Sequence, residues 1–349
     1  MTAAALRPTR PLSVAVVGAT GAVGHEFLAV MAQRKFPVGT LRLLASRRSA
    51  GQKLAYDGRE HVIEELTEQS FAGIDVAFFS AGGSISKSHA PIAAAAGAIV
   101  VDNSSAFRMD PKCPLVVPEV NPHALAGIRL GQAGGAIVAN PNCSTIIMLM
   151  GVDPIRRAVG VSRIVVSTYQ AASGAGAAAM EELRAQTADV LAGKPAQPKI
   201  FPQQYAFNLF SHNSAMQPDG YNQEEVKMVK ESHRIWGDAA VGITATCIRV
   251  PVMRAHAESI NLTLKAPLSE AEALDVLKKA PGVTVIDDRA GNRFPTPLDA
   301  SHQDDVLVGR VRTDHSQPNG LGLNLFVCGD QLRKGAALNA VQIAERILA

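Results

Sequence analysis

A short polar turn, Asn140 to Thr145, lies between an apolar strand-like run and an apolar helical run, and it places Cys143 at the start of a helix. Backbone N–H groups without helical partners gather at such a start, together with the positive end of the helix dipole, and both favour a thiolate over a thiol. The same N–H groups can stabilise an oxyanion on a bound substrate. Cys143 is therefore a candidate nucleophile, and a small buried thiol without chemistry is the alternative.

A second chemical signature lies near the N-terminus, where the strand-like run 13–17 leads into Gly18-Ala-Thr-Gly-Ala-Val-Gly24 and then into a helical pattern. A strand, a glycine turn and a helix start are the parts of a dinucleotide site, because glycine permits the tight turn and the helix N-terminus receives the pyrophosphate. The spacing is Gly-x-x-Gly-x-x-Gly, so the prediction depends on the flanking elements. The expected cofactor contacts are Gly18, Thr20, Gly21, Ala22 and Val23.

The residues after the next expected strand, 41–45, bear on the choice of cofactor. An NAD-binding chain would offer Asp or Glu there, but this chain has Ser46-Arg47-Arg48-Ser49. Two guanidinium groups and two hydroxyls suit a 2′-phosphate, so Ser46, Arg48 and Ser49 predict NADP. An ordinary solvated basic loop is the alternative. Ser80 directly follows a later strand, 74–79. Sheets of this kind bind ligands at the C-terminal ends of their strands, so Ser80 is a further expected contact.

Size and composition favour a two-domain globular protein, since the chain has 349 residues, 47% of them hydrophobic and 19% charged. A net charge of +3 and 5% aromatic residues argue against a nucleic-acid partner. The four cysteines are far apart without a Cys-x-x-Cys pair, so we expect no metal site, no disulfide framework and a reducing cytoplasm. No apolar stretch of membrane-spanning length occurs. Residues 1–10 are interpreted as a loose leader.

The order of expected elements defines two domains. Strands alternate with helices up to the cysteine turn, which predicts a doubly wound parallel sheet for an NADP-binding domain of residues 11–142 with 331–349. Strands then cluster with few helices, which predicts an α+β catalytic and dimerisation domain, 143–330, with a largely antiparallel sheet. A helix is expected at 222–236 and an irregular loop at 193–221. A closing helix within 331–348 is expected to pack back on the first domain.

Six segments in this order together resemble the aspartate-semialdehyde dehydrogenases, and they span nearly the whole chain. They are Gly18–Gly24, Asn103–Arg108, Pro141–Thr145, Tyr169–Gly174, Arg249–His256 and Leu332–Ala337. The resemblance implies NADP-dependent, reversible conversion of aspartate 4-semialdehyde and phosphate to aspartyl 4-phosphate, running in cells towards the aldehyde. It also implies a homodimer and a place in the biosynthesis of diaminopimelate, lysine, threonine and methionine.

The resemblance assigns the reacting centre. Cys143 would form an acyl-thioester, and Asn142 with the Cys143 N–H would hold the oxyanion. His256 would be the acid/base, although a lone histidine in such a segment is more often structural. Gln170 would orient the acyl group; without the resemblance it reads as a polar turn residue.

The resemblance also assigns the groups that bind substrate and nicotinamide. Arg249 would clamp the α-carboxylate, Arg108 and Lys227 would hold phosphate, and Glu224 would take the ammonium. By pattern alone, Glu224 and Lys227 share a helical face as an ordinary surface ion pair. Three further residues would approach the nicotinamide side: Ser173, Gly174 and Gln331. Many relatives have Asn at the position of Gln331. Arg254 has no role in this scheme.

Two competing readings keep the fold but change the function. N-acetyl-glutamyl-phosphate reductases and the related malonyl-CoA reductases use the same thioester strategy, but an N-acylated substrate has no ammonium for Glu224. A non-catalytic NADP-binding protein would be expected to lack Cys143, His256 or Gln170, and all three are present.

Overall fold

The computed structural model describes residues 10–349, which divide into two compact units, 10–142 with 336–349 and 143–335. Residues 1–9 of the expected leader lie outside the described residues. Arg10, which we grouped with that leader, pairs with Asp75 at 2.7 Å between guanidinium nitrogen and carboxylate oxygen. No helix within residues 10–349 is long and apolar enough to cross a membrane.

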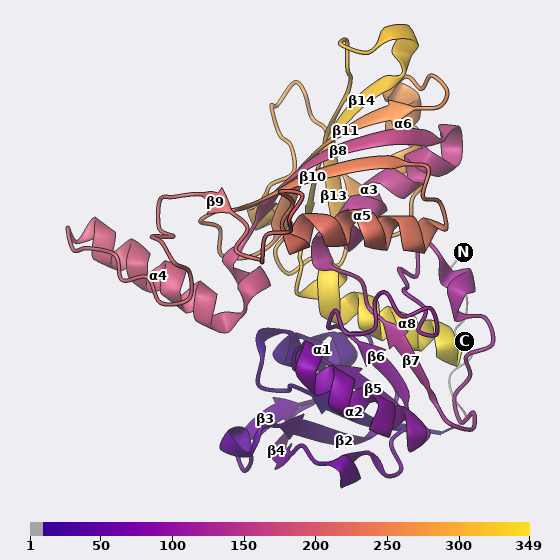
Figure 1. The fold of residues 1–349 in the computed structure, drawn as a ribbon, viewed down its shortest axis with the longest axis vertical. Coiled ribbons are helices and arrows are strands. Elements are labelled where there is room, and N and C mark those ends of the chain that lie inside the picture. Colours follow the sequence, from indigo (N-terminus) through magenta and orange to yellow (C-terminus); the bar gives the residue numbers. More distant parts are fainter. Residues whose placement is uncertain (1–9) are drawn as a thin grey trace. The chain divides into compact units, whose positions relative to one another are not determined.

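The first unit is built on a doubly wound sheet, as predicted (Figure 1). In spatial order its strands are β3 (Lys53–Tyr56), β4 (Arg59–Glu65), β2 (Val38–Ala45), β1 (Leu12–Val17), β5 (Val76–Phe79), β6 (Ile99–Asp102) and β7 (Ala136–Ala139). All neighbours are parallel except β3 and β4. The chain proceeds outward from β1 in both directions, so the topological switch point lies between β1 and β5.

Helices cover both faces of this sheet, and the sequence of β1 shows why it is apolar throughout. Val14 and Val16 pack on the side of α1 (Ala22–Gln33) and α8 (Leu338–Leu348). Ala15 and Val17 pack in the opposite cluster with residues of α2 (Gly83–Ala95). The expected packing of the closing helix on the first domain is confirmed by contacts of α8 with α1 and β6.

The closing helix differs from its prediction in one respect. The α-helical part begins only at Leu338, and a π-helical turn, Arg333–Ala337, precedes it. The Asp330 carboxylate caps this turn, accepting hydrogen bonds from the N–H groups of Leu332 and Arg333 at 2.9 and 3.2 Å. The Asp330 carbonyl accepts from the Gly335 N–H at 3.1 Å, five residues further on, which is the π-helical pattern.

The second unit contains a seven-stranded, largely antiparallel sheet, as predicted. In spatial order its strands are β12 (Val283–Val285), β13 (Val306–Thr313), β14 (Gly322–Gly329), β11 (His256–Leu264), β8 (Val161–Gln170), β10 (Gly242–Arg249) and β9 (Phe210–Ser211). Only β12 with β13 and β8 with β10 run parallel. The sequence analysis missed β3, β4, β9 and β12.

Helices α3 (Cys143–Val159), α5 (Gln223–Trp236) and α6 (Glu270–Lys278) contact this sheet, and α3 contacts both α5 and α6. Two others, α4 (Ala177–Leu191) and the short α7 (Pro297–Ala300), complete the unit. Helix α5 has strong ends, since Asn222 and Glu225 form a capping box and Gly237 closes the helix at φ +63°. The cap fixes the first turn of α5, which carries Glu224.

Candidate active site

Cys143 is the first residue of α3, as the sequence predicts, and its side chain is half-buried and forms no disulfide. The four N–H groups of a first helical turn have no partner inside the helix and point at this end. The backbone of Gly335 approaches the cysteine so closely that a Cβ there would lie 2.9 Å from the Cys143 Cβ. Glycine at 335 thus leaves room for the sulfur at the helix start.

His256, the first residue of β11, is fully buried, and the hydrogen bond that it makes defines its tautomer. Its Nδ1 accepts from the Ala171 N–H at 3.0 Å, so the ring proton of the neutral imidazole lies on Nε2. No partner for Nε2 exists among the described residues. Burial, followed by the charge of Arg249, lowers the pKa of His256 to about 3. The ring is therefore neutral and offers one N–H donor.

Arg249, the last residue of β10, has its guanidinium held on several sides. Its Nε donates to Asn213 Oδ1 at 3.3 Å, Nη1 to the Ala171 carbonyl at 3.3 Å, and Nη2 lies 2.7 Å from His212 Nε2. The ring of Phe201 lies 5.7 Å from the guanidinium carbon. Burial lowers the pKa of Arg249, while nearby groups, Cys143 among them, act against that shift.

Gly174 brings His256 and Arg249 together. A Cβ added at Gly174 would lie 3.0 Å from His256 Nε2 and 3.1 Å from Arg249 Nη1. Both nitrogens therefore lie against the same glycine, and any larger residue there would displace them.

Gln170 lies at the end of β8 and is almost fully buried. Its Nε2 donates to Ser144 Oγ at 3.0 Å and lies 3.4 Å from Glu224 Oε1. The side chain therefore joins the start of α3 to the start of α5, which a polar turn residue would not do.

Glu224 and Lys227 form the expected pair one helical turn apart, with 3.0 Å between Lys227 Nζ and Glu224 Oε2. This is not an ordinary surface ion pair, because the Glu224 side chain is only 5% exposed and that of Lys227 31%. A carboxylate buried to this degree is a favourable partner for cationic groups.

Two of the residues expected near the nicotinamide lie in contact with each other. Gln331 Nε2 donates to Ser173 Oγ, and Gln331 Oε1 accepts from the Ala255 N–H at 3.0 Å. The longer amide of Gln331, where many relatives were expected to have Asn, is thus held at both ends.

In the first unit, the glycine turn follows β1 at the topological switch point. Gly18 has φ +85°, and a Cβ there would overlap the Ser80 carbonyl, so only glycine fits. A Cβ at Gly24 would likewise overlap the backbone of Gly18 and Ala19, where α1 begins. The turn and Ser80 form a narrow backbone cradle at a helix N-terminus, which fits a dinucleotide pyrophosphate.

The basic segment after β2 forms a short 3-10 turn, Arg47–Ser49, closed by a 2.8 Å hydrogen bond from the Ser49 N–H to the Ser46 carbonyl. Ser46 and Arg48 are exposed and Ser49 is half-buried. An exposed guanidinium beside two hydroxyls, following a strand next to β1, fits a 2′-phosphate.

Arg108 and Asn142 are both buried in the first unit. The Arg108 guanidinium donates to the carbonyls of Asn140 and Asn103, each at 2.9 Å. Arg108 thus stabilises the segment that leads directly to Cys143.

Sequence reasoning missed His212, Asn213 and Ser214, which surround Arg249 and the start of α5. They lie in the segment interpreted as an irregular loop, and only their polar character distinguished them. Arg254, left without a role, bonds to Asp330 at 2.6 Å and thereby supports the turn that precedes α8.

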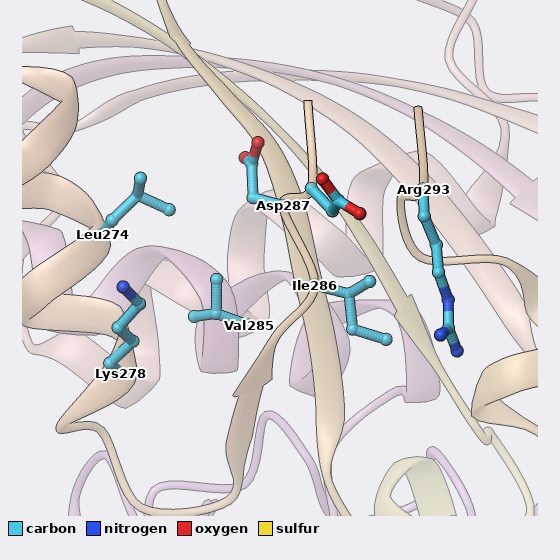
Figure 2. A pocket seen from close by; sticks show the side chains of 7 residues that line it. Leu274, Lys278, Val285, Ile286, Asp287 and Arg293 are labelled. Carbon is cyan, nitrogen blue, oxygen red and sulfur yellow. The ribbon is translucent and has the colours of Figure 1, made fainter. Parts of the chain in front are cut away.

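A separate pocket of about 420 Å³ lies in the second unit and contains none of the predicted site residues (Figure 2). Its two carboxylates support the local backbone: Asp287 accepts from the Val311 N–H at 2.7 Å and Asp288 from the Gly291 N–H at 2.9 Å. Within residues 10–349, no group of three or more His, Cys, Asp or Glu side chains is placed to hold a metal ion.

Comparison with known families defines the class first. Residues 13–128 match the NAD binding domain of semialdehyde dehydrogenases, and residues 152–334 match the semialdehyde dehydrogenase dimerisation domain. The chain is thus a two-domain oxidoreductase of the semialdehyde dehydrogenase class.

Individual relatives narrow the class. Aspartate-semialdehyde dehydrogenase of Synechocystis sp. is 52% identical, covering 97% of this chain and 98% of the relative, and that of Aquifex aeolicus is 50% identical, covering 96% and 97%. A crystal structure of aspartate semialdehyde dehydrogenase II from Vibrio cholerae, complexed with ASA, has a TM-score of 0.92 at 46% identity and covers 97% of this chain and 98% of that one. The chain belongs to the aspartate-semialdehyde dehydrogenase family.

Proposed function

We propose that this chain catalyses NADP-dependent reductive dephosphorylation of L-aspartyl 4-phosphate to L-aspartate 4-semialdehyde, reversibly, through a thioester on Cys143. One observation carries the proposal: a cysteine at a helix start shares its unit with a neutral histidine donor and an arginine that lie against one glycine. The first unit adds a backbone cradle for the dinucleotide.

The covalent steps follow from the position of Cys143. Its thiolate attacks the acyl carbon, a C–S bond forms, and the C–O bond to phosphate breaks with its electron pair leaving on phosphate. NADPH, when bound, supplies the hydride that reduces the thioester carbon. The resulting thiohemiacetal oxyanion collapses, the C–S bond breaks, and Cys143 regains its electron pair as the aldehyde leaves. Asn142 and the Cys143 N–H are proposed to stabilise the two oxyanions.

His256 is proposed to donate a hydrogen bond to the oxygen of the thiohemiacetal. Because Nδ1 is engaged by the Ala171 N–H, the group available to the substrate is Nε2–H. That N–H donates to the oxyanion as charge develops, and in the reverse direction it stabilises the same oxyanion. Gln170, bonded to Ser144 at the start of α3, orients the acyl group.

The charged groups match an amino-acid substrate bearing a phosphoryl group. Arg249 binds the α-carboxylate and Glu224 binds the ammonium, while Arg108 and Lys227 hold phosphate. The burial of Glu224 favours a substrate with a free amino group, because a buried carboxylate is stabilised by a cationic ligand and an N-acylated substrate has no ammonium to provide. This favours aspartyl phosphate over N-acetyl-glutamyl phosphate.

The residues proposed to hold the cofactor fall into three groups. Gly18, Thr20, Gly21, Ala22, Val23 and Ser80 approach the pyrophosphate, Ser46, Arg48 and Ser49 the 2′-phosphate, and Ser173, Gly174 and Gln331 the nicotinamide. The exposed Arg48 beside two hydroxyls supports NADP over NAD.

The direct test is phosphate-dependent reduction of NADP⁺ by aspartate semialdehyde, with N-acetylglutamate semialdehyde assayed in parallel. We expect turnover with the first and little with the second. Comparable rates with both, or turnover without phosphate, would contradict the proposal.

A homodimer formed through the sheet of the second unit is also proposed. Tyr169, Thr246 and Ser259 are exposed on the strands β8, β10 and β11, so one face of the sheet is open in the single chain. Bare sheet is normally covered, and the matched dimerisation domain agrees. We expect a dimer by light scattering at micromolar concentration; a monomer would refute this.

The proposed reaction would serve biosynthesis of diaminopimelate, lysine, threonine and methionine. A cytoplasmic location is proposed because none of the four cysteines forms a disulfide.

A further inference from the structure

His212 makes an unusually restrictive contact with the substrate arginine. It follows β9, where Phe210 pairs with Arg249 of β10, and its Nε2 lies 2.7 Å from Arg249 Nη2. A guanidinium has only donors, so His212 Nε2 must be the acceptor. The ring proton of neutral His212 is therefore on Nδ1. Burial, followed by the charge of Arg249, lowers the pKa of His212 to about 4, in keeping with a neutral ring.

The Ser214 hydroxyl oxygen accepts a hydrogen bond from the Nδ1–H of His212. His212 Nδ1 lies 3.1 Å from Ser214 Oγ, which also accepts from the Glu224 N–H at 3.1 Å and donates to Asn222 Oδ1 at 3.3 Å. One donor and two acceptors use the full capacity of a hydroxyl. The Ser214 N–H also lies 3.1 Å from Nδ1, but the shorter, charge-assisted contact to Arg249 decides the tautomer.

The contacts of Arg249 determine what remains for a ligand. Asn213 accepts a hydrogen bond from the Nε–H, the Ala171 carbonyl accepts from one Nη1–H, and His212 accepts from one Nη2–H. A guanidinium has five N–H donors, so one is left on each terminal nitrogen. One N–H on each terminal nitrogen is what a bidentate contact with a carboxylate requires.

We propose that His212 is a positioning residue: through Nε2 it orients Arg249, and through Ser214 it sets the distance from that arginine to Glu224. The substrate specificity of the site for a free α-amino acid then depends on the relay Arg249–His212–Ser214, because carboxylate and ammonium must be bound at one spacing. This rests on the proposed function, which assigns Arg249 and Glu224 to those two groups.

The test compares His212→Phe with His212→Gln in steady-state kinetics. Phenylalanine keeps an aromatic ring at this half-buried position but removes the acceptor, so KM for aspartate semialdehyde should rise about tenfold or more, the loss expected of one charge-assisted hydrogen bond. KM for phosphate and kcat should change by less than about twofold, since neither depends on the relay. Glutamine keeps an acceptor within reach and should recover most of the loss.

Coupling to Arg249 separates positioning from a general structural role. In an Arg249→Leu background, His212→Phe should cause no further rise in the KM for the semialdehyde, because the group on which it acts is gone. His233 provides a matched control: its Nε2 lies 2.8 Å from the Val241 carbonyl at the far end of α5, and His233→Phe should leave both KM values unchanged.

Three results would overturn the inference: an unchanged KM in His212→Phe, an equal further loss in the Arg249→Leu background, or no recovery with glutamine. If His212→Phe fails to fold, Ser214→Ala replaces it, with a rise in the same KM of about threefold from loss of one neutral hydrogen bond. Calorimetric binding of the semialdehyde to Cys143→Ala, with and without His212→Phe, gives the comparison without turnover. Absence of turnover in the wild type would refute the proposed function, whereas equal affinities in that calorimetry would refute the relay.

Discussion

The two units prepare their chemistry in opposite ways. In the first, the proposed cofactor cradle consists mostly of backbone, a glycine turn that follows β1 and meets the Ser80 carbonyl. In the second, the site consists of buried side chains from β8, β10, β11 and α5, which hold one another in place. A backbone cradle needs small residues at fixed spacing within one segment. A side-chain site needs partners from distant segments. Removing single side chains from it should therefore change different kinetic constants.

The largest effect is expected from Cys143→Ala, because the covalent intermediate cannot form without the sulfur. We expect kcat to fall at least about 10⁴-fold while NADP binding and the melting temperature remain unchanged. Stopped assays and cofactor titration measure the two readouts. A variant that keeps even a few per cent of wild-type turnover would rule out the thioester route.

Recognition and chemistry should separate within the second unit. His256→Ala should lower kcat by on the order of a hundredfold with both KM values nearly unchanged, since its Nε2–H acts on the developing oxyanion. Because the pKa of His256 is lowered to about 3, the ring stays neutral above that pH. The pH profile of kcat/KM should therefore show no His256 step near pH 6.5.

Arg249 and Arg108, one from each unit, offer the sharpest comparison. Arg249→Leu should raise KM for the semialdehyde by about tenfold to a hundredfold, and Arg108→Leu should raise KM for phosphate, with some loss of turnover. Even Arg249→Lys should raise KM for the semialdehyde, because an ammonium cannot make the paired planar contact with a carboxylate. The same pattern in both leucine variants would mean that separate clamps do not exist.

A smaller effect is expected in the first unit from Arg48→Glu. Repulsion would replace a charge-assisted contact to the 2′-phosphate, so affinity for NADP should fall about tenfold or more while that for NAD changes little. Fluorescence titration with both cofactors measures this. An equal loss for NADP and NAD would remove Arg48 from the proposed site.

The smallest effect concerns Glu258, which lies two residues after His256 and is fully buried with neither carboxyl oxygen paired among the described residues. Burial raises the pKa of Glu258 well above its ordinary value. The folded state therefore keeps the proton where the unfolded state loses it, and stability falls as pH rises above the unfolded value near 4.5. Glu258→Gln should melt a few degrees higher than wild type at pH 8, with a smaller gain at pH 5. Equal gains at both pH values would contradict the assignment.

The sequence by itself determined the features that are local in the chain. The strand, glycine turn and helix of residues 12–33 were predicted because their hydrogen bonds and backbone angles are set within one segment. The position of Cys143 at a helix start was predictable for the same reason. Short strands such as β3 and β9 were missed, because a few half-exposed residues show no clear alternation and are stabilised mainly by their neighbours.

Only the tertiary structure decided how distant residues combine. Pattern alone made Glu224 and Lys227 a surface pair, but packing against β10 and the His212–Ser214 segment buries the carboxylate. His212 gave no signal in the sequence, since its tautomer and its value as an acceptor follow from Arg249 across a strand pair. Such contacts depend on side chains brought together by the sheet, which no local pattern encodes.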